Sequence, residues 1–207
     1  TRLSFDLVAV NNLEVNNGIM MNVKSLPALS LVVFCVVSLV APSASAADPA
    51  DLDVKLDQVA PSHPRLFFTA EQDAELRARI DGAPLLKKTF AHLLAAADKA
   101  LERDPVERKK VGKRLLGVSR RCLQRVFCLA FAHRMTGKAA YLERAEEEML
   151  AAAAFSDWNP SHFLDVAEMT MALAIGYDWL HSGLAPKTRD TIRGAIVEKG
   201  LETSLKG

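Results

Sequence analysis

Residues 162–199, HFLDVAEMTMALAIGYDWLHSGLAPKTRDTIRGAIVEK, decide the fold class of this chain. The part over residues 166–180 is strongly apolar, whereas residues 187–199 are rich in charged side chains. Gly183 and Pro186 lie between the two parts, and a glycine stop followed by an opening proline is typical of a short link between helices. The stretch therefore predicts a helical hairpin in which an apolar inner helix precedes a charged outer helix.

The same order of helices occurs once before, at a spacing of about 45 residues. Residues 122–135 are the more apolar segment, Gly137 follows them, and residues 141–150 are the more charged segment. Repeated hairpins of this kind stack into solenoids or close into toroids, and composition does not choose between the two. We predict an all-α fold built from helical hairpins.

Helix caps and breakers set the remaining boundaries. Thr69 followed by Gln72 forms a capping box, Pro84 opens a helix, and Ser161 is expected to cap the helix of the quoted stretch. No run of alternating β-branched residues is long enough for a strand. These signals predict helices over the following ranges: 69–82, 84–101, 113–137, 138–154, 161–183 and 186–200.

The chain before the helices divides into three predicted segments. Residues 1–19 fit neither a signal nor a domain, and we expect them to lie upstream of the true start. Residues 20–46 hold a lysine, an apolar run and a small-residue cleavage site, which is the pattern of a signal peptide. The run is shorter than the roughly 20 residues that span a bilayer, so we expect no stable membrane anchor. Residues 47–62 predict an extended lead-in to a domain over 63–207, in a secreted or periplasmic protein.

The overall charge of the chain does not require a particular kind of partner. The formal net charge is +1, which requires neither a nucleic acid nor a membrane surface.

Cys122 and Cys128 project from different faces of one predicted helix and cannot easily pair. We predict buried thiols, so the core has to hold the domain together without a disulfide.

The polar stretch 155–169, FSDWNPSHFLDVAEM, interrupts the helical texture. Between an outer helix and the next inner helix of a toroid, a loop lies at the rim of the central cavity. Trp158 would offer a stacking face to a sugar ring, and Asn159 and His162 would hydrogen-bond to hydroxyls or a carboxylate. We take four residues as substrate-binding candidates: Trp158, Asn159, His162 and Glu168.

Each of these residues also has a structural interpretation. Trp158 would plug the hairpin, His162 would cap or pack, and Asp165 would be favoured by the helix dipole alone. His162 and Glu168 are six residues apart, so they do not share one face of the helix. This spacing gives little support to a metal site. The remaining histidines and the end of the inner helix are interpreted as structural: His63, His92, His133, His181, Tyr177, Asp178 and Trp179.

Nine Lys or Arg residues lie between Arg103 and Arg125, against only two acidic residues. A solvated helix face is one interpretation of this stretch. Interaction with an acidic polymer is the other, and in a secreted protein an acidic polysaccharide suits it better than nucleic acid. No aromatic residue interleaves the charges, which further weakens the case for nucleic acid.

Motifs of several enzyme classes are absent from the sequence. It holds no Gly-rich phosphate loop, no CxxC, no HExxH and no G-x-S-x-G. We therefore expect no cofactor and no metal site.

Two blocks resemble the N-terminal part of the heparinase II/III family of polysaccharide lyases. They are HPRLFFTAEQDAELRARI at 63–80 and DWNPSHFLDVAEMTMALAIGYDWLHSGLAPKTRDTIRGAIVEKGLE at 157–202. The resemblance implies an (α/α) toroid followed by a β-sandwich domain, of which this chain would be the first part of an incomplete toroid. It also implies β-elimination at a uronic acid, in which the carboxylate is neutralised, a base takes the C5 proton and an acid protonates the leaving oxygen. The family's catalytic Asn, His and Tyr groups are expected beyond Gly207, so none is assigned here.

The sequence thus predicts part of a secreted lyase that cleaves an acidic, uronic-acid-containing glycan, and that is inactive over this segment alone. A glycoside hydrolase on a similar toroid is one alternative, and it would need two carboxylates across a cleft. A non-catalytic helical-repeat binding module is another, suggested by GKAAYLERAEEEML at 137–150.

Overall fold

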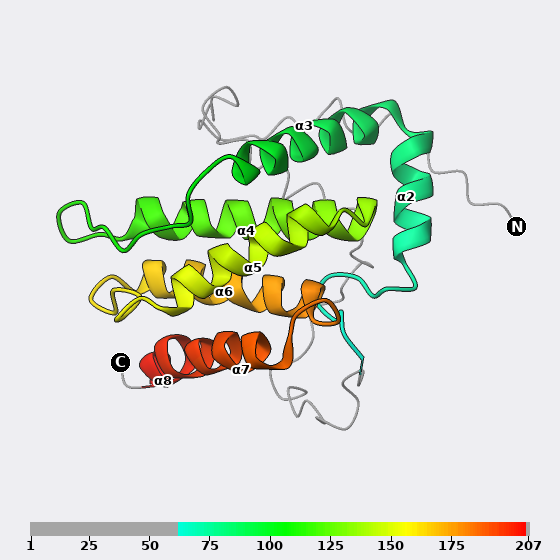
Figure 1. The fold of residues 1–207 in the computed structure, drawn as a ribbon. Coiled ribbons are helices and arrows are strands. Elements are labelled where there is room, and N and C mark those ends of the chain that lie inside the picture. Colours follow the sequence, from blue (N-terminus) through cyan, green and yellow to red (C-terminus); the bar gives the residue numbers. More distant parts are fainter. Residues whose placement is uncertain (1–61, 206–207) are drawn as a thin grey trace, which may run out of the picture.

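The computed structural model describes residues 62–205, and all regular secondary structure in this range is helical (Figure 1). This confirms the predicted all-α class. The predicted upstream segment, the signal peptide and nearly all of the lead-in lie outside the described residues. In chain order the elements are α2 (Asp73–Gly82), α3 (Pro84–Leu101), α4 (Leu116–Thr136), α5 (Ala139–Ala153), α6 (Phe163–Leu180), α7 (Pro186–Ala195), the π-helical segment η4 (Ile196–Leu201) and α8 (Glu202–Leu205).

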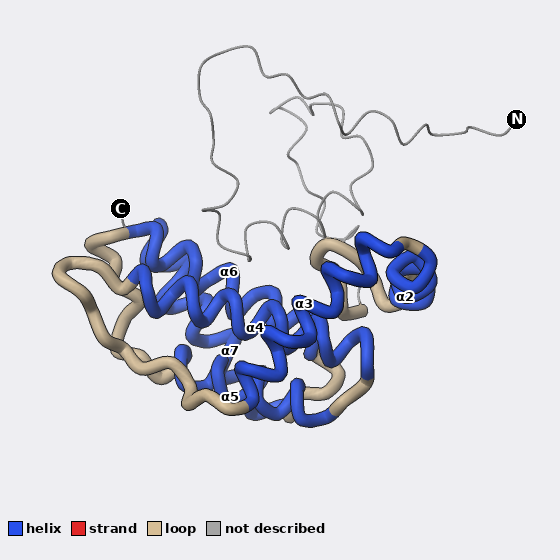
Figure 2. Tube along the Cα trace, turned by 90° about the horizontal axis from the view of Figure 1, so that it is seen from above, coloured by secondary structure: helices blue, strands red, loops and turns tan. Residues whose placement is uncertain are grey.

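Two helical hairpins, α4–α5 and α6–α7, form the body of the molecule. Helix α4 packs against both α5 and α6, and α5 packs against α7, so the hairpins lie side by side. Seen from above, α3, α4 and α6 lie in one layer, with α5 and α7 in a second layer (Figure 2). Two stacked hairpins are common to solenoids and toroids, so the toroid remains a proposal.

The core lies between these layers and is centred on α4. Phe68, Phe127, Phe131 and Trp179 form a connected group of rings, with 5.2 Å between the centroids of Phe127 and Trp179. Gly176 lets α6 approach the hairpin beside it, because a Cβ at this position would overlap the side chains of Met149 and Val126.

Both described cysteines are free and buried within α4, as predicted. Burial raises the pKa of the Cys122 thiol well above its usual range, and it raises the pKa of the Cys128 thiol to about 12. Neither thiol is therefore ionised near neutral pH, which is the behaviour of packing residues.

Three predicted helix starts are wrong. Helix α2 begins at Asp73 rather than at residue 69, and no side chain caps it, although the backbone N–H of Thr69 does donate to the side chain of Gln72 over 2.9 Å. Helix α4 begins at Leu116 rather than at residue 113, because residues 111–114 form a tight turn in which Gly112 has φ of 59°. The two ends of this turn exchange backbone hydrogen bonds, with Val111 N–H donating to Arg114 O over 2.9 Å. Ser161 does not cap α6, which begins at Phe163; its hydroxyl contacts the side-chain oxygen of Asn159 instead.

The segment before α2 is tied to the end of α6. The Asp178 carboxylate accepts hydrogen bonds from the backbone N–H groups of Arg65 and Leu66, each over 2.8 Å, and lies 2.6 Å from His63 Nδ1. The indole of Trp179 donates to the carbonyl of Leu66 over 3.0 Å. Asp178 and Trp179 therefore hold the N-terminal segment against the end of α6. Among residues 62–205, no helix has the length and apolar character required to cross a membrane.

Candidate functional site: a basic groove between two helices

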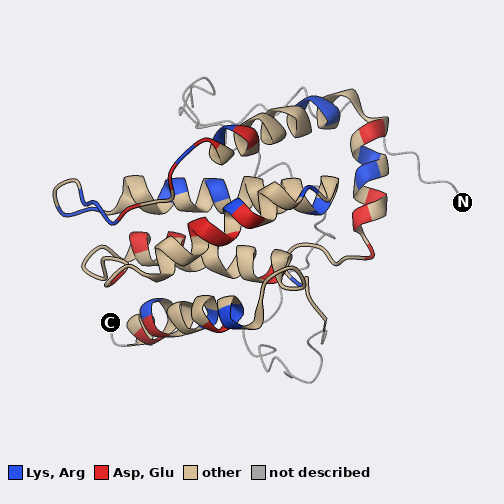
Figure 3. Cartoon of the chain, viewed as in Figure 1, with Lys and Arg blue, Asp and Glu red and all other residues tan. Residues whose placement is uncertain are grey.

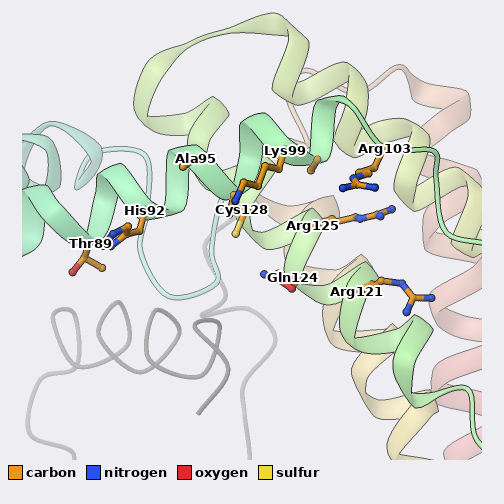
Figure 4. Close-up of a pocket in the computed structure, with 11 residues that line it drawn as sticks. Thr89, His92, Ala95, Lys99, Arg103, Arg121, Gln124, Arg125 and Cys128 are labelled. Carbon is orange, nitrogen blue, oxygen red and sulfur yellow. The ribbon is translucent and has the colours of Figure 1, made fainter. Parts of the chain in front are cut away.

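A groove of about 650 Å³ lies between α3 and α4 (Figure 4). Its α3 wall includes three alanines, Ala95, Ala96 and Ala100, whose small side chains leave space above the α4 wall. The polar groups that line the groove are Thr89, His92, Lys99, Arg103, Arg121, Gln124 and Arg125.

Helical spacing brings these residues to one side of each helix. On α3 and its continuation, His92, Lys99 and Arg103 follow one another at intervals of seven and four residues. On α4, Arg121 and Arg125 are four residues apart and Gln124 lies between them. Because α3 packs directly against α4, the two faces meet and their side chains converge.

The groove is cationic at one end and neutral at the other. Figure 4 shows Arg103, Arg121 and Arg125 gathered at one end, with Thr89 and His92 at the opposite end. Among the described residues, no Asp or Glu lines this hollow. A ligand that fits it would present negative charge at one end and hydrogen-bonding groups at the other.

Three of these cations make no contact that neutralises them. Within residues 62–205, the side chains of Lys99, Arg103 and Arg121 form neither an ion pair nor a hydrogen bond. An Arg side chain holds its five donors in a planar fork that matches a carboxylate. The groove thus keeps at least two such forks available for an anion.

A buried network fixes the cationic end of the groove. Arg144 donates to the backbone carbonyl of Arg103 over 2.8 Å and to the carboxylate of Glu148 over 2.7 Å. Arg125 contacts the same carboxylate at 3.3 Å and donates to the carbonyl of Asp104 over 2.8 Å. Glu148 is fully buried. The end of α3 and the guanidinium of Arg125 are therefore held in place before any ligand arrives.

A smaller hollow of about 290 Å³ adjoins the groove. It shares Arg121 and Arg125 with the groove and adds Lys109 from the loop between α3 and α4. Asp104 and Glu107 also line it, so its charge is mixed.

Of the four predicted binding residues, Trp158 and Asn159 are buried in the chain itself. Trp158 is 0% exposed and its indole N–H donates to the carbonyl of Ala152 over 3.0 Å, so it presents no stacking face. Asn159 is 2% exposed, and its amide donates to the carbonyl of Lys113 and to the carboxylate of Asp165. These two residues join loops rather than line a hollow.

His162 and Glu168 also have partners within the chain. His162 Nδ1 lies 3.1 Å from Asp165 Oδ1 as an ion pair, and neither of these two atoms has a hydrogen-bond partner among the described residues. Glu168 accepts a hydrogen bond from the hydroxyl of Ser119 over 2.6 Å and lies 3.2 Å from Arg120 Nε. None of the four predicted residues lines the groove or the adjoining hollow.

Asp165 is the centre of this second polar region. Its burial opposes ionisation, yet hydrogen bonds from Asn159 and from the backbone N–H of Leu115, together with His162, hold the pKa of the carboxyl below its usual range. The carboxylate is 0% exposed and joins the start of α6 to the start of α4. It therefore acts as a link between the two inner helices.

The groove residues were only partly visible in the sequence. Arg103, Arg121 and Arg125 belong to the predicted basic stretch, whereas Lys99 and Gln124 stood out in no pattern. His92 was interpreted as a packing residue, but it is exposed and lines the groove. The available signal was the recurrence of cations on one face of each helix.

In the part of the chain that the structure describes, no cluster of three or more His, Cys, Asp or Glu side chains is arranged to hold a metal ion. Neither a protein-family model nor a curated protein sequence matches this chain.

Proposed function

We propose that this chain is a helical part of a secreted polysaccharide lyase, and that the groove between α3 and α4 binds its acidic, uronic-acid-containing glycan. The observation that carries the proposal is a set of three cations, Lys99, Arg103 and Arg121, that have no partner within the described residues. They line a preformed groove to which the described residues contribute no acidic side chain, and Arg103 and Arg121 lie at one end of it. The sequence resemblance at residues 63–80 and 157–202 supports the reaction class.

The groove matches the chemistry of a uronic acid residue. A uronate carries one carboxylate, which a guanidinium binds through two parallel hydrogen bonds, and several hydroxyls. Thr89 and His92 at the opposite end, and Gln124 beside the arginines, supply donors and acceptors for hydroxyls. The volume of about 650 Å³ falls within the roughly 300–1,000 Å³ of small-molecule sites. Neutralising the carboxylate is also the first requirement of β-elimination.

The groove argues against a glycoside hydrolase at this position. Such an enzyme needs two carboxyl groups across the scissile bond, and no carboxylate of residues 62–205 lines the groove. A helical-repeat binding module remains the second candidate, because α4–α5 and α6–α7 stack as repeats do. Its ligand in this groove would be an acidic peptide.

Affinity for acidic glycans tests the proposal. We would titrate the full chain with polygalacturonate, alginate and neutral dextran, and repeat this with the triple variant Lys99→Gln, Arg103→Gln, Arg121→Gln. We expect the acidic glycans alone to bind, with an affinity that falls as salt rises, and a loss of at least about tenfold in the variant.

A matched triple variant controls for net charge. Lys87→Gln, Lys88→Gln and Lys187→Gln remove the same charge from exposed positions outside the groove, and should bind as the unaltered chain does. An equal loss in both triples would show general charge attraction and would contradict a site at the groove. Binding of a polyglutamate peptide with no binding of acidic glycan would favour the repeat module instead.

A further inference from the structure

We propose that the groove is one half of an extended polyanion site, the other half being the basic turn formed by residues 109–114. This inference rests on the proposed function and narrows it, because it extends the contact with the glycan beyond the sugars that the groove itself holds. It also assigns a role to the polar stretch around residues 157–165, which lines neither hollow.

The basic turn concentrates charge at the end of the hairpin body. Figure 3 shows Lys and Arg gathered on the loop between α3 and α4. Four exposed cations lie in it: Lys109, Lys110, Lys113 and Arg114. Within the described residues, the side chains of Lys109, Lys113 and Arg114 have no ion-pair or hydrogen-bond partner. Val111 at its tip is 82% exposed, so the turn projects into solvent.

The smaller hollow connects this turn to the groove. It shares Arg121 and Arg125 with the groove, and its third cation, Lys109, begins the turn. A chain of acidic sugars could therefore pass from Lys99 and Arg103, over Arg121, to Lys109. Asp104 and Glu107 border the same hollow, and they would disfavour a carboxylate placed directly against them.

Contacts with the stretch 157–165 hold the turn in position. Arg108 pairs with Asp157 over 2.7 Å, and Lys110 Nζ lies 3.4 Å from the side-chain oxygen of Asn159. Asn159 also donates to the carbonyl of Lys113 over 2.9 Å. Together these bonds clamp both sides of the turn to a buried anchor. A turn fixed in advance loses less conformational freedom when a polymer binds.

The backbone conformation of Asn159 helps to hold the buried anchor in place. Asn159 has φ of 60°, a left-handed conformation that asparagine adopts more readily than most residues. In this conformation its backbone N–H reaches Asp157 over 2.7 Å and its amide reaches Asp165. The same residue therefore orders its own loop and the basic turn.

The dependence of affinity on ligand length tests the two-part site. We would measure binding of trigalacturonate and of long-chain polygalacturonate to the unaltered chain, to Lys99→Gln with Arg103→Gln, and to the turn variant Lys109→Gln, Lys113→Gln, Arg114→Gln. The groove variant should weaken both ligands. The turn variant should weaken only the polymer, by at least about tenfold, because only the polymer reaches both halves.

A second variant separates positioning from charge. Asn159→Gly keeps every cation and tolerates the left-handed backbone, but removes the bond to Lys113. It should weaken polymer binding while trigalacturonate affinity stays the same. Circular dichroism of each variant would confirm that the helices are intact.

Several results would overturn the inference. Equal weakening of trimer and polymer by the turn variant would place the turn in a single small site. An unchanged polymer affinity would remove the turn from the site while the groove proposal stood. Turn-dependent binding to vesicles of phosphatidylglycerol and phosphatidylcholine, without any effect on polymer, would assign the turn to a membrane surface. Failure of the unaltered chain to bind either uronide would reject the proposed function itself.

Discussion

The groove between α3 and α4 and the junction around Asp165 are both rich in polar side chains, but they differ in how those side chains are satisfied. At the junction, Asn159 and the carboxylate of Asp165 are buried and bonded to each other and to the backbone. In the groove, Lys99, Arg103 and Arg121 face an open hollow and have no partner in the part of the chain that the structure describes. Polar density alone therefore does not identify a binding site. The decisive property is whether the chain satisfies its own polar groups.

We expect the largest loss of stability from removing the carboxylate of Asp165 at the junction. Asp165→Ala would leave the N–H of Leu115 and the amide of Asn159 without their acceptor in a buried site. We expect a loss on the order of 3 kcal/mol in the free energy of unfolding, measured by urea denaturation followed by circular dichroism.

Asp190→Ala is the matched control for this change. Asp190 is 70% exposed and pairs with Arg193 on the surface of α7, so its loss should change stability by less than about 0.5 kcal/mol. If both alanine variants were equally stable, Asp165 would not be the structural link that its contacts indicate.

The second prediction concerns the backbone at the junction. Asn159→Ala should cost on the order of 2 kcal/mol, because alanine lacks the amide bonds and resists φ of 60°. Asn159→Gly loses the same bonds without the strain, so it should be about 1 kcal/mol more stable than the alanine variant. Thermal unfolding of the pair measures the difference, and equal melting temperatures would show that the left-handed backbone carries no cost.

The sequence predicted the helices better than it predicted the site. Pro84, Pro186 and Gly82 marked helix boundaries because proline and glycine act locally through the backbone. The start of α4 was missed because Gly112 and the turn around it interrupt an apparently helical basic stretch. Local signals cannot show whether such charges lie on a helix or on a turn.

The site was harder to predict because it depends on which faces meet. Trp158 was taken as a sugar platform from its polar neighbours, yet it packs with 0% exposure against the end of α5. His92 was taken as a packing residue from its apolar neighbours, yet it lines the groove. In both cases tertiary contacts between helices, which neighbouring residues do not encode, decided the environment.

A third polar cluster, at the end of α6, is intermediate between the buried junction and the open groove. We expect its contribution to stability to depend on pH. His181 stacks on His63, with 4.0 Å between ring centroids. Its burial, with the charges of His63, Arg189 and Arg65, lowers the pKa of His181 below its ordinary 6.5, against the effect of Asp178. As pH falls through about 6.5 the unfolded chain binds the proton before the folded chain does, so His181 should reduce stability on the acid side.

Urea unfolding at about pH 7.5 and about pH 5 measures this effect. His181→Gln cannot take up the proton, so it should lose less stability on acidification than the unaltered chain does. We expect the difference to be smaller than the loss in either junction variant, because His181 is only partly buried. An identical pH dependence in the two proteins would assign the acid sensitivity to other groups.

We expect the smallest change in the free energy of unfolding for a variant of the groove. Lys99→Gln with Arg103→Gln removes two cations that have no partner within the described residues, so the free energy of unfolding should change by less than about 0.5 kcal/mol. Relief of repulsion with Arg121 and Arg125 favours a small gain rather than a loss. The same double variant should lose affinity for acidic glycan, so stability and binding would separate at this site. A marked loss of stability would instead mean that the chain itself satisfies these cations. The groove would then be a structural feature, as the junction is.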